Sequence, residues 1–145
     1  MEKTVHSLDE FNAEAKRFTE ELTPQPTGAT LVTLSGDLGA GKTAFTKAVA
    51  KTLGVSEMVT SPTFVLEKIY ALPGEKAFKR LVHIDAYRLE SGAELSPLGF
   101  DEVMKDSQTL VFLEWPEKVA DALPRPAAHI SLTVTGDSRK ISYGS

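Results

Sequence analysis

Hydrophobic residues recur along this chain with two different periods, and the changes of period predict its elements. From residue 8 to residue 22 they recur at helical spacing, and Ser7 and Glu10 have the spacing of a capping box at the start of that helix. Residues 29–34, ATLVTL, have the composition of a strand, and residues 42–53 again show helical spacing. The apolar positions predicted to face the core from these two helices are Leu8, Phe11, Ala15, Phe18, Leu22, Phe45, Val49 and Leu53.

The remaining sequence is dominated by strand-like runs. Residues 63–72 and 79–87 flank the tetrapeptide PGEK, which is typical of a hairpin connection. Residues 109–115 form an almost continuous apolar run, as expected for a strand covered on both faces. Residues 128–137 and 139–144 are predicted to form a final pair of strands.

Short helices are predicted between these strands. Residues 91–106 have the pattern of two helical pieces separated near Pro97 and Gly99, and residues 116–123 that of one short helix with Pro116 at its start. The alternation of strands and helices favours an α/β fold with a mainly parallel central sheet, helices on both faces and additional antiparallel strands. A ligand is then expected beyond the carboxyl ends of the parallel strands.

Length and composition narrow the class of protein. With 145 residues, the chain is expected to form a single domain with one core. Its net charge of -4 argues against binding to nucleic acid by charge alone. The absence of cysteine excludes disulfides and thiolate metal sites, and no segment has the pattern of a signal peptide or a membrane span. We therefore expect a cytoplasmic protein.

The stretch SGDLGAGKT, residues 35–43, carries the clearest chemistry. Gly36, Gly41, Lys42 and Thr43 match the phosphate-loop pattern G-x-x-x-x-G-K-[ST], between a predicted strand and a predicted helix as the pattern requires. The glycines let backbone N–H groups approach phosphate oxygens. Lys42 is expected to place its ammonium between the β and γ phosphates, and the Thr43 hydroxyl to ligate Mg²⁺. We therefore predict a single P-loop NTPase domain.

Two carboxylates stand where a magnesium ion and an attacking water would need them. Asp85 ends the apolar run LVHID, and Glu114 ends the run LVFLE. If both strands adjoin the phosphate loop, one carboxylate holds the metal, directly or through water, and the other orients the water. From periodicity alone, each residue fits a solvent-exposed strand end about equally well.

Three further features have both a functional and a structural interpretation. TSPTF at residues 60–64 concentrates hydroxyls around a proline, so it fits either a switch-like segment that responds to the γ phosphate or a turn that leads into a strand. Trp115 is either a platform beside the nucleotide site or a core anchor, and Glu117 is close enough in sequence to reach the ribose or base. His83 is given no catalytic role, because a lone histidine in a strand is more often structural.

In combination these motifs resemble those of the bacterial TsaE family, formerly YjeE, the small ATPase of tRNA threonylcarbamoyladenosine biosynthesis. The resemblance is carried by GDLGAGKT, SPTF, HIDAYRL and LEWPE, in an order that extends over almost the whole chain. A phosphate loop alone occurs in many proteins, whereas this set of four motifs is far more specific. TFVLE and HIDAY differ from the commoner TYTLV and HFDLY but keep the hydroxyl, carboxylate and tyrosine positions.

The resemblance implies a role for each motif. Thr43 and Glu114 would hold Mg²⁺, and Lys42 and Asp85 are the expected catalytic residues. The residues expected to contact the nucleotide are Glu10, Gly36, Asp37, Leu38, Gly39, Ala40, Gly41, Lys42, Thr43 and Glu117. The residues of the switch-like segment are Thr60, Ser61, Pro62 and Thr63.

The function implied by the resemblance is slow ATP hydrolysis coupled to a tRNA-modifying assembly. The implied cofactors are ATP and Mg²⁺. The implied partners are the TsaD and TsaB proteins, with tRNA contacted through their complex and with no membrane involved. TsaD would modify the adenosine next to the anticodon in tRNAs that read codons beginning with A, and this chain would reset or regulate it.

Two alternatives remain open, a P-loop small-molecule kinase and a non-catalytic nucleotide sensor. Kinases of this kind commonly bring arginines from a mobile lid, whereas the five arginines of this chain form no cluster in a lid-sized insertion. These are Arg17, Arg80, Arg88, Arg125 and Arg139. A sensor and a slow ATPase would look alike in sequence, although the presence of Lys42, Thr43, Asp85 and Glu114 together favours catalysis.

Overall fold

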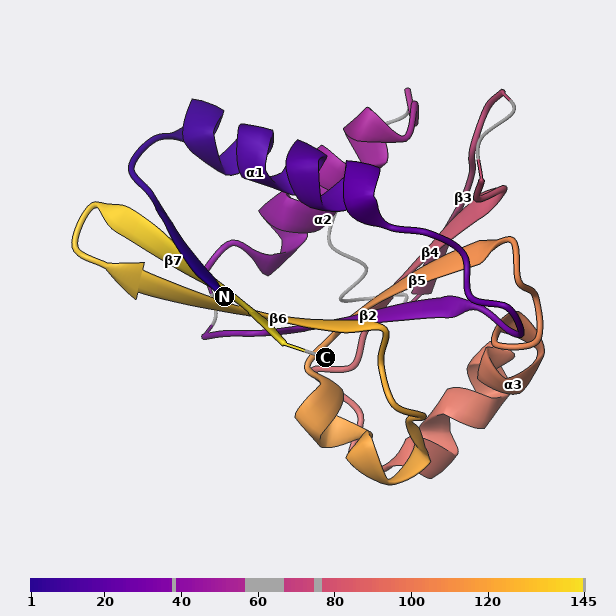
Figure 1. Ribbon diagram of the computed structural model, residues 1–145. Helices are drawn as coiled ribbons and strands as arrows, with labels where there is room; N and C mark the ends of the chain where they lie inside the picture. Colours follow the sequence, from indigo (N-terminus) through magenta and orange to yellow (C-terminus); the bar gives the residue numbers. More distant parts are fainter. Residues whose placement is uncertain (38, 57–66, 75–76, 145) are drawn as a thin grey trace.

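The computed structural model describes residues 1–37, 39–56, 67–74 and 77–144, which fold around one sheet (Figure 1). The sheet has the strand order β1-β7-β6-β2-β5-β4-β3. The strands are β1 (Glu2–Val5), β2 (Thr30–Ser35), β3 (Glu67–Ala71), β4 (Arg80–Asp85), β5 (Thr109–Glu114), β6 (Ala128–Thr135) and β7 (Ser138–Gly144). The helices are α1 (Leu8–Glu21), α2 (Lys42–Thr52) and α3 (Phe100–Val103), with the 3-10 helices η1 (Gly92–Leu98), η2 (Pro116–Lys118) and η3 (Ala120–Ala122).

Parallel pairing is confined to the middle of the sheet. β2 runs parallel to β5 and to β6, and β4 runs parallel to β5. Antiparallel pairs extend the sheet on both sides, with β7 between β1 and β6 and with β3 beside β4. The predicted α/β fold, with a mainly parallel centre and additional antiparallel strands, is confirmed.

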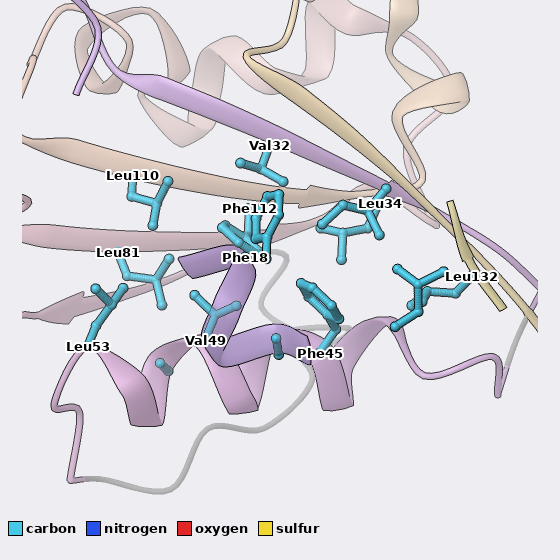
Figure 2. Close-up of a cluster of buried hydrophobic side chains, with 14 of the residues drawn as sticks. Phe18, Val32, Leu34, Phe45, Val49, Leu53, Leu81, Leu110, Phe112 and Leu132 are labelled. Atoms are coloured by element: carbon cyan, nitrogen blue, oxygen red, sulfur yellow. The ribbon is translucent and has the colours of Figure 1, made fainter. Parts of the chain in front are cut away.

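Helices cover both faces of the sheet, as predicted. α1 and α2 lie on one face, and η1, α3, η2 and η3 lie on the other (Figure 1). The layer under α1 and α2 is a buried cluster in which Phe45 from α2 and Phe112 from β5 are completely buried (Figure 2). The second layer buries Leu95, Phe100 and Val111. Each layer removes apolar surface from water, which stabilises the fold by about 25 cal/mol per Å² buried.

The start of α1 is fixed by Ser7 as the predicted N-cap. Only one of the two hydrogen bonds of the predicted capping box forms, because the carboxylate of Glu10 reaches the N–H of His6 instead of that of Ser7. The Oγ of Ser7 accepts a hydrogen bond from the backbone N–H of Glu10 at 3.1 Å, and the carboxylate of Glu10 accepts one from the N–H of His6 at 3.1 Å. The buried members of the predicted stripe on this helix are Phe11, Ala15 and Phe18. Leu8 is the exception, because it faces an outer groove between α1 and α2 and is 69% exposed.

Two short segments differ from the prediction. The sequence pattern predicts no strand at residues 2–5, where β1 lies, because β1 has one buried side chain and is defined by its pairing with β7. Residues 116–123 form two 3-10 helices instead of one helix, because Val119 between them is completely buried and has non-helical backbone angles. The two helical pieces predicted within residues 91–106 are found, and they meet at Gly99.

The remaining predicted strands agree with the structure where it is described. All six residues of β5 are buried, as expected for a strand covered on both faces. β6 and β7 form the predicted final pair, and β3 and β4 form the predicted antiparallel pair. Residues 63–66 of the run assigned to the first strand of that pair lie outside the described residues. In the described part of the chain, every helix is too short or too polar to cross a bilayer.

Candidate functional site

The phosphate-loop sequence lies at the carboxyl end of β2, where the chain turns into α2. β5 runs parallel to β2, and β4 runs parallel to β5, so the carboxyl ends of all three strands lie at one edge of the sheet. Asp85 at the end of β4 is the register partner of Glu114 at the end of β5. Parallel sheets bind ligands at this edge. The topology therefore places both carboxylates beside the phosphate loop.

Two glycines of the loop have backbone conformations that disfavour any other residue. Gly36 has a φ of +149°, and a Cβ built on it would lie 2.6 Å from the carbonyl oxygen of Leu132. Gly41 has a φ of +111° and precedes the first residue of α2. The loop can therefore pass close to β6 and turn the N-terminus of α2, with its partial positive charge, toward a bound anion.

Lys42 is turned back into the loop and is 5% exposed. Its Nζ donates hydrogen bonds to the carbonyl oxygen of Gly36 and, at 3.4 Å, to that of Asp37. Nζ also lies 3.9 Å from the ring centre of Trp115, within the range of a cation–π contact. Burial lowers the pKa of Lys42 below its usual range, while the carboxylate of Glu114 acts in the opposite direction. The loop thus holds a cation whose charge is only partly compensated by its surroundings.

Glu114 links the phosphate loop to β4. Its Oε2 accepts a hydrogen bond from Oγ1 of Thr43 at 3.2 Å and lies 2.5 Å from Nε2 of His83. Glu114 is 3% exposed and His83 is completely buried. Nδ1 of His83 has no hydrogen-bond partner among the described residues, so the imidazole is oriented through Nε2. The carboxylate is held from two sides, by the loop and by β4.

Asp85 and Trp115 lie beside this contact. Asp85 is 5% exposed, and its Oδ1 accepts a hydrogen bond from the N–H of Tyr87 at 3.0 Å. Trp115 has a φ of 62°, an unusual value for a bulky residue, and its N–H donates to the carbonyl oxygen of Leu34 at 3.1 Å. Its ring contacts that of Tyr87, with 5.0 Å between the ring centres. The ring of Trp115 therefore contacts both Tyr87 and Lys42, and its role as a platform for a nucleotide stays a prediction.

The oxygen atoms at this edge suit a magnesium ion that is shared with a nucleotide. The hydroxyl of Thr43 and the carboxylate of Glu114 are hard oxygen donors, which Mg²⁺ prefers, and they are 3.2 Å apart. In the described ranges, no group of three or more His, Asp or Glu side chains could hold a metal without other ligands. Mg²⁺ usually combines one or two carboxylates with phosphate oxygens and water. The two protein donors fit that pattern.

A pocket of about 340 Å³ lies next to the phosphate loop. Its walls come from β1 and α1, from the start of α2, and from the turn between β6 and β7 together with the start of β7. Phe11 contributes apolar surface, Gly41 connects the pocket to the loop, and Asp137 and Arg139 contribute charged groups. Both the volume and the mixture of apolar and polar groups are typical of small-molecule sites.

Glu10 and Glu117, both expected near the adenosine, lie in different places. Glu10 lies beside this pocket, but its carboxylate is bonded to His6, which is one of the lining residues. Glu117 is exposed on η2 and lines a separate groove with Ser35 and His129. The structure does not bring the two carboxylates together around one pocket, and their contacts with a nucleotide stay predictions.

Some of the other predicted site residues lie in the described part of the loop, and the rest lie outside the described residues. In the described loop, the N–H of Ala40 donates to the carbonyl oxygen of Asp37 at 3.0 Å, and Gly39 has a φ of +81°. The predicted site residues that lie outside the described residues are Leu38, Thr60, Ser61, Pro62 and Thr63.

Three residues of the site were not assigned to it from sequence. His83 has one local signal, its position two residues before Asp85, which puts both side chains on the same face of a strand. Asp137 and Arg139 have none, because Arg139 reaches the pocket through the pairing of β7 with β1 and Asp137 reaches it from the turn that precedes β7. These positions depend on contacts between segments far apart in the sequence.

Comparisons with known proteins agree with one another. The family described as "Threonylcarbamoyl adenosine biosynthesis protein TsaE" matches residues 5–141. A tRNA threonylcarbamoyladenosine biosynthesis protein TsaE from Rickettsia typhi is 33% identical over 139 residues, which are 95% of this chain and 90% of that protein. The protein of the same name from Bacillus subtilis is 39% identical over 117 residues, which are 78% of this chain and 68% of that protein.

A solved structure has the same fold. The crystal structure of YdiB from Bacillus subtilis matches with a TM-score of 0.77 and 30% sequence identity, over 99% of this chain and 83% of that chain. The family match, the relatives and the solved structure all extend over most of the sequence. The chain therefore belongs to the TsaE family, whose members serve in tRNA threonylcarbamoyladenosine biosynthesis.

Proposed function

We propose that this chain binds Mg-ATP and hydrolyses it slowly in the cytoplasm, in support of threonylcarbamoyladenosine formation on tRNA. The observation that carries the proposal is the hydrogen bond between Thr43 and Glu114 at the start of α2, beside Lys42. Nucleoside triphosphate hydrolysis needs a phosphate cradle, oxygen donors for a metal and a group that positions water. Membership of the TsaE family supports the link to tRNA modification.

Four side chains have separate tasks in this proposal. Lys42 leaves the carbonyl oxygen of Gly36 and binds the β and γ phosphates together with the N–H groups of the loop. Thr43 and Glu114 would hold Mg²⁺, which would supply positive charge to neutralise the phosphates. Asp85, buried at the end of β4, orients the attacking water by accepting its hydrogen bond.

The nucleoside end of ATP occupies the pocket beside Gly41. This pocket adjoins the loop residue that precedes α2, so a ligand whose phosphates lie on the loop can extend into it. Phe11 offers an apolar surface to a base, and Asp137 and Arg139 offer hydrogen-bonding groups at the rim.

The energy of hydrolysis is passed to the TsaD and TsaB proteins, and tRNA is reached through their complex. The acidic net charge of -4 supports action through proteins, because it gives the chain no general attraction for RNA. TsaD would be the enzyme that is reset or regulated, and the family's role in threonylcarbamoyladenosine biosynthesis supports the link to that pathway.

Steady-state phosphate release, measured with and without the TsaD–TsaB complex, tests the enzymatic proposal. We expect slow Mg-dependent release, and we expect Lys42→Ala to abolish productive ATP binding by removing the phosphate cation. Asp85→Ala should reduce turnover more than ATP affinity, because it positions water. No release by the wild-type chain under either condition would overturn the ATPase assignment.

A deletion strain tests the pathway. Loss of the threonylcarbamoyl group from tRNA, restored by the wild-type gene and not by Lys42→Ala, is the expected result. Normal modification in the deletion strain would contradict the proposed role.

A further inference from the structure

A groove runs along the outer side of the helical layer, between α1 and α2. These two helices lie side by side on one face of the sheet (Figure 1). The groove has a volume of about 740 Å³, roughly twice that of the pocket beside the phosphate loop. Its apolar surface comes from Leu8 and Ala13 of α1 and from Ala44 and Ala48 of α2. Leu8, 69% exposed, is an apolar side chain of a size that usually packs against something.

Three lysines and one glutamate line the edge of this groove, Lys16 and Glu20 from α1 and Lys47 and Lys51 from α2. All three lysines are exposed, and within the described part of the chain none of them forms an ion pair. Lys47 and Lys51 are four residues apart on one helix, where like charges repel. Lys51 lies in the last turn, where a cation is favourable, but Lys47 has no such compensation. With three lysines against the single carboxylate of Glu20, the groove keeps an excess of positive charge on a chain whose net charge is -4.

The combination of an apolar floor and a lysine rim selects one kind of occupant. An acidic amphipathic segment of a protein fits it, because its apolar side chains would cover Leu8 and its carboxylates would pair with Lys47 and Lys51. RNA phosphates would pair with the lysines, but they would leave the apolar floor uncovered and would meet repulsion from the remaining acidic surface.

The groove is continuous with the pocket beside the phosphate loop. Leu8 and Ala44 line both of them. A segment lying in the groove would therefore cover one wall of the pocket. Because the groove and the pocket share these side chains, a segment bound in the groove changes the binding free energy of a nucleotide in the pocket. The nucleotide changes the binding free energy of the segment by the same amount.

We propose that the groove between α1 and α2 docks an acidic amphipathic segment of the partner proteins, and that docking slows the release of a nucleotide from the adjoining pocket. This inference rests on the proposed function, since it assigns a surface to the partners named there. It adds which face of the chain the partners contact and how that contact changes the rate of nucleotide release.

A matched pair of double variants tests the surface. Lys47→Glu/Lys51→Glu reverses the charge of the groove, and Lys79→Glu/Lys105→Glu makes the same change in net charge at exposed lysines outside it. The affinity of the purified full-length chain for the purified TsaD–TsaB complex is measured with Mg-ATP present. We expect the groove variant to bind about tenfold more weakly or worse, and the control to stay within about twofold of wild type. Lys47→Arg/Lys51→Arg should retain the affinity.

Two further measurements complete the test. The ATP affinity of each isolated variant should match the wild type, because none of these side chains lines the phosphate loop or the pocket beside it. Each variant should still unfold cooperatively, with the groove variant slightly less stable because it loses a cation in the last turn of α2. The complex should slow dissociation of a fluorescent ATP analogue from the wild-type chain and from the control, and much less from the groove variant.

The outcomes separate the two proposals. If the wild-type chain does not bind the TsaD–TsaB complex, the proposed partners and the groove assignment are both wrong. If it binds and the groove variant binds equally well, or if both double variants lose affinity equally, only the groove assignment fails. Loss of affinity for tRNA without loss of affinity for the protein complex would show that the lysines serve RNA instead.

Discussion

The carboxylate of Glu114 receives hydrogen bonds from two side chains that are far apart in the sequence. Thr43 belongs to the phosphate loop and His83 to the middle of β4, and both contact the same oxygen, Oε2. Because Glu114 is nearly completely buried, its direction is set by these partners and not by solvent. In the proposed function, the imidazole positions a metal ligand without touching the metal.

His83→Ala should therefore raise the Mg²⁺ concentration needed for ATP binding by about 10- to 100-fold, the usual cost of losing a group that orients a metal ligand. The measurement is a Mg²⁺ titration of the binding of a slowly hydrolysed ATP analogue. His83→Gln, which keeps a donor near the position of Nε2, should recover much of the affinity. An unchanged Mg²⁺ requirement in a folded His83→Ala protein would show that the imidazole only fills space.

The buried charge of Lys42 lowers the stability of the folded chain when no nucleotide is bound. Burial lowers its pKa, so the folded chain disfavours the charged form relative to water. We expect Lys42→Met to raise the free energy of unfolding of the nucleotide-free protein by about 0.5–2 kcal/mol, because functional residues commonly reduce stability. Urea unfolding with and without Mg-ATP measures both effects, since the variant should also lose stabilisation by the nucleotide. Lys47→Met, at an exposed position of the same helix, is the control. A less stable Lys42→Met protein would refute the argument.

Among the residues of the site, those that belong to a local sequence pattern can be predicted, and those whose role depends on a distant partner cannot. Lys42 and Thr43 follow from a contiguous motif. Asp85 and Glu114 follow from where two apolar runs end, although their closeness depends on the strand order. The role of His83 depends on one atom of Glu114 in the neighbouring strand, and periodicity carries no information about such a contact.

Among the elements, α1 and β7 are joined by a buried polar contact. Glu14 of α1, 4% exposed, accepts a hydrogen bond from the hydroxyl of Tyr143 at 2.5 Å and two from the guanidinium of Arg17, at 2.7 and 3.0 Å. The hydrogen bond from Arg17, followed by that from Tyr143, holds the pKa of Glu14 below its usual value, against the effect of burial. Tyr143 also stacks on Phe18, so the carboxylate fixes an aromatic side chain of the core.

This contact predicts a pH dependence of stability. The folded-state pKa of Glu14 lies below its unfolded value near 4.5, so its contribution is complete above that pH and is lost as the pH falls through the folded-state pKa. At pH 7, Glu14→Gln should lower the free energy of unfolding by about 1–3 kcal/mol. The difference from wild type should shrink in urea titrations carried out well below pH 4.5. Glu21→Gln removes the exposed partner of Arg17 and should have little effect. A difference that is independent of pH would contradict this explanation.

The elements that sequence predicts are those with a strong internal pattern. α1 has a serine N-cap and an apolar stripe, and β5 has six consecutive buried residues. β1 has neither, since three of its four residues are exposed and it becomes a strand by pairing with β7. Leu8 was expected in the core from its spacing, but the first residue of α1 faces the groove. Amphipathic spacing says which residues share a face, and tertiary packing decides how much of that face is covered.

For the whole molecule, the site combines a local part with a part assembled from distant segments. The phosphate loop is made by residues between β2 and α2, which are adjacent in sequence. The pocket beside it needs β1, α1 and the turn between β6 and β7. A chain that ends after Thr135 should therefore keep the phosphate-loop sequence and lose the wall formed by Asp137 and Arg139.

We expect this shortened chain to gain no protection from proteolysis when Mg-ATP is added, whereas the full chain should be protected. The comparison can be made with chains held on the ribosome by a tether long enough to expose them. Equal protection of the two chains would show that β7 and the turn before it are dispensable for nucleotide binding.

The pairing of β1 with β7 also determines when the sheet can be completed during protein synthesis. β1 leaves the ribosome first, yet it has to wait for β7, about 130 residues later, which takes roughly 7 to 26 s at bacterial rates of elongation. Until then, Glu2–Val5 has no neighbour in the sheet and the pocket has no far wall. If the proposed function holds, an unfinished chain would lack one wall of the nucleotide pocket, and full nucleotide binding would require that β7 has been synthesised.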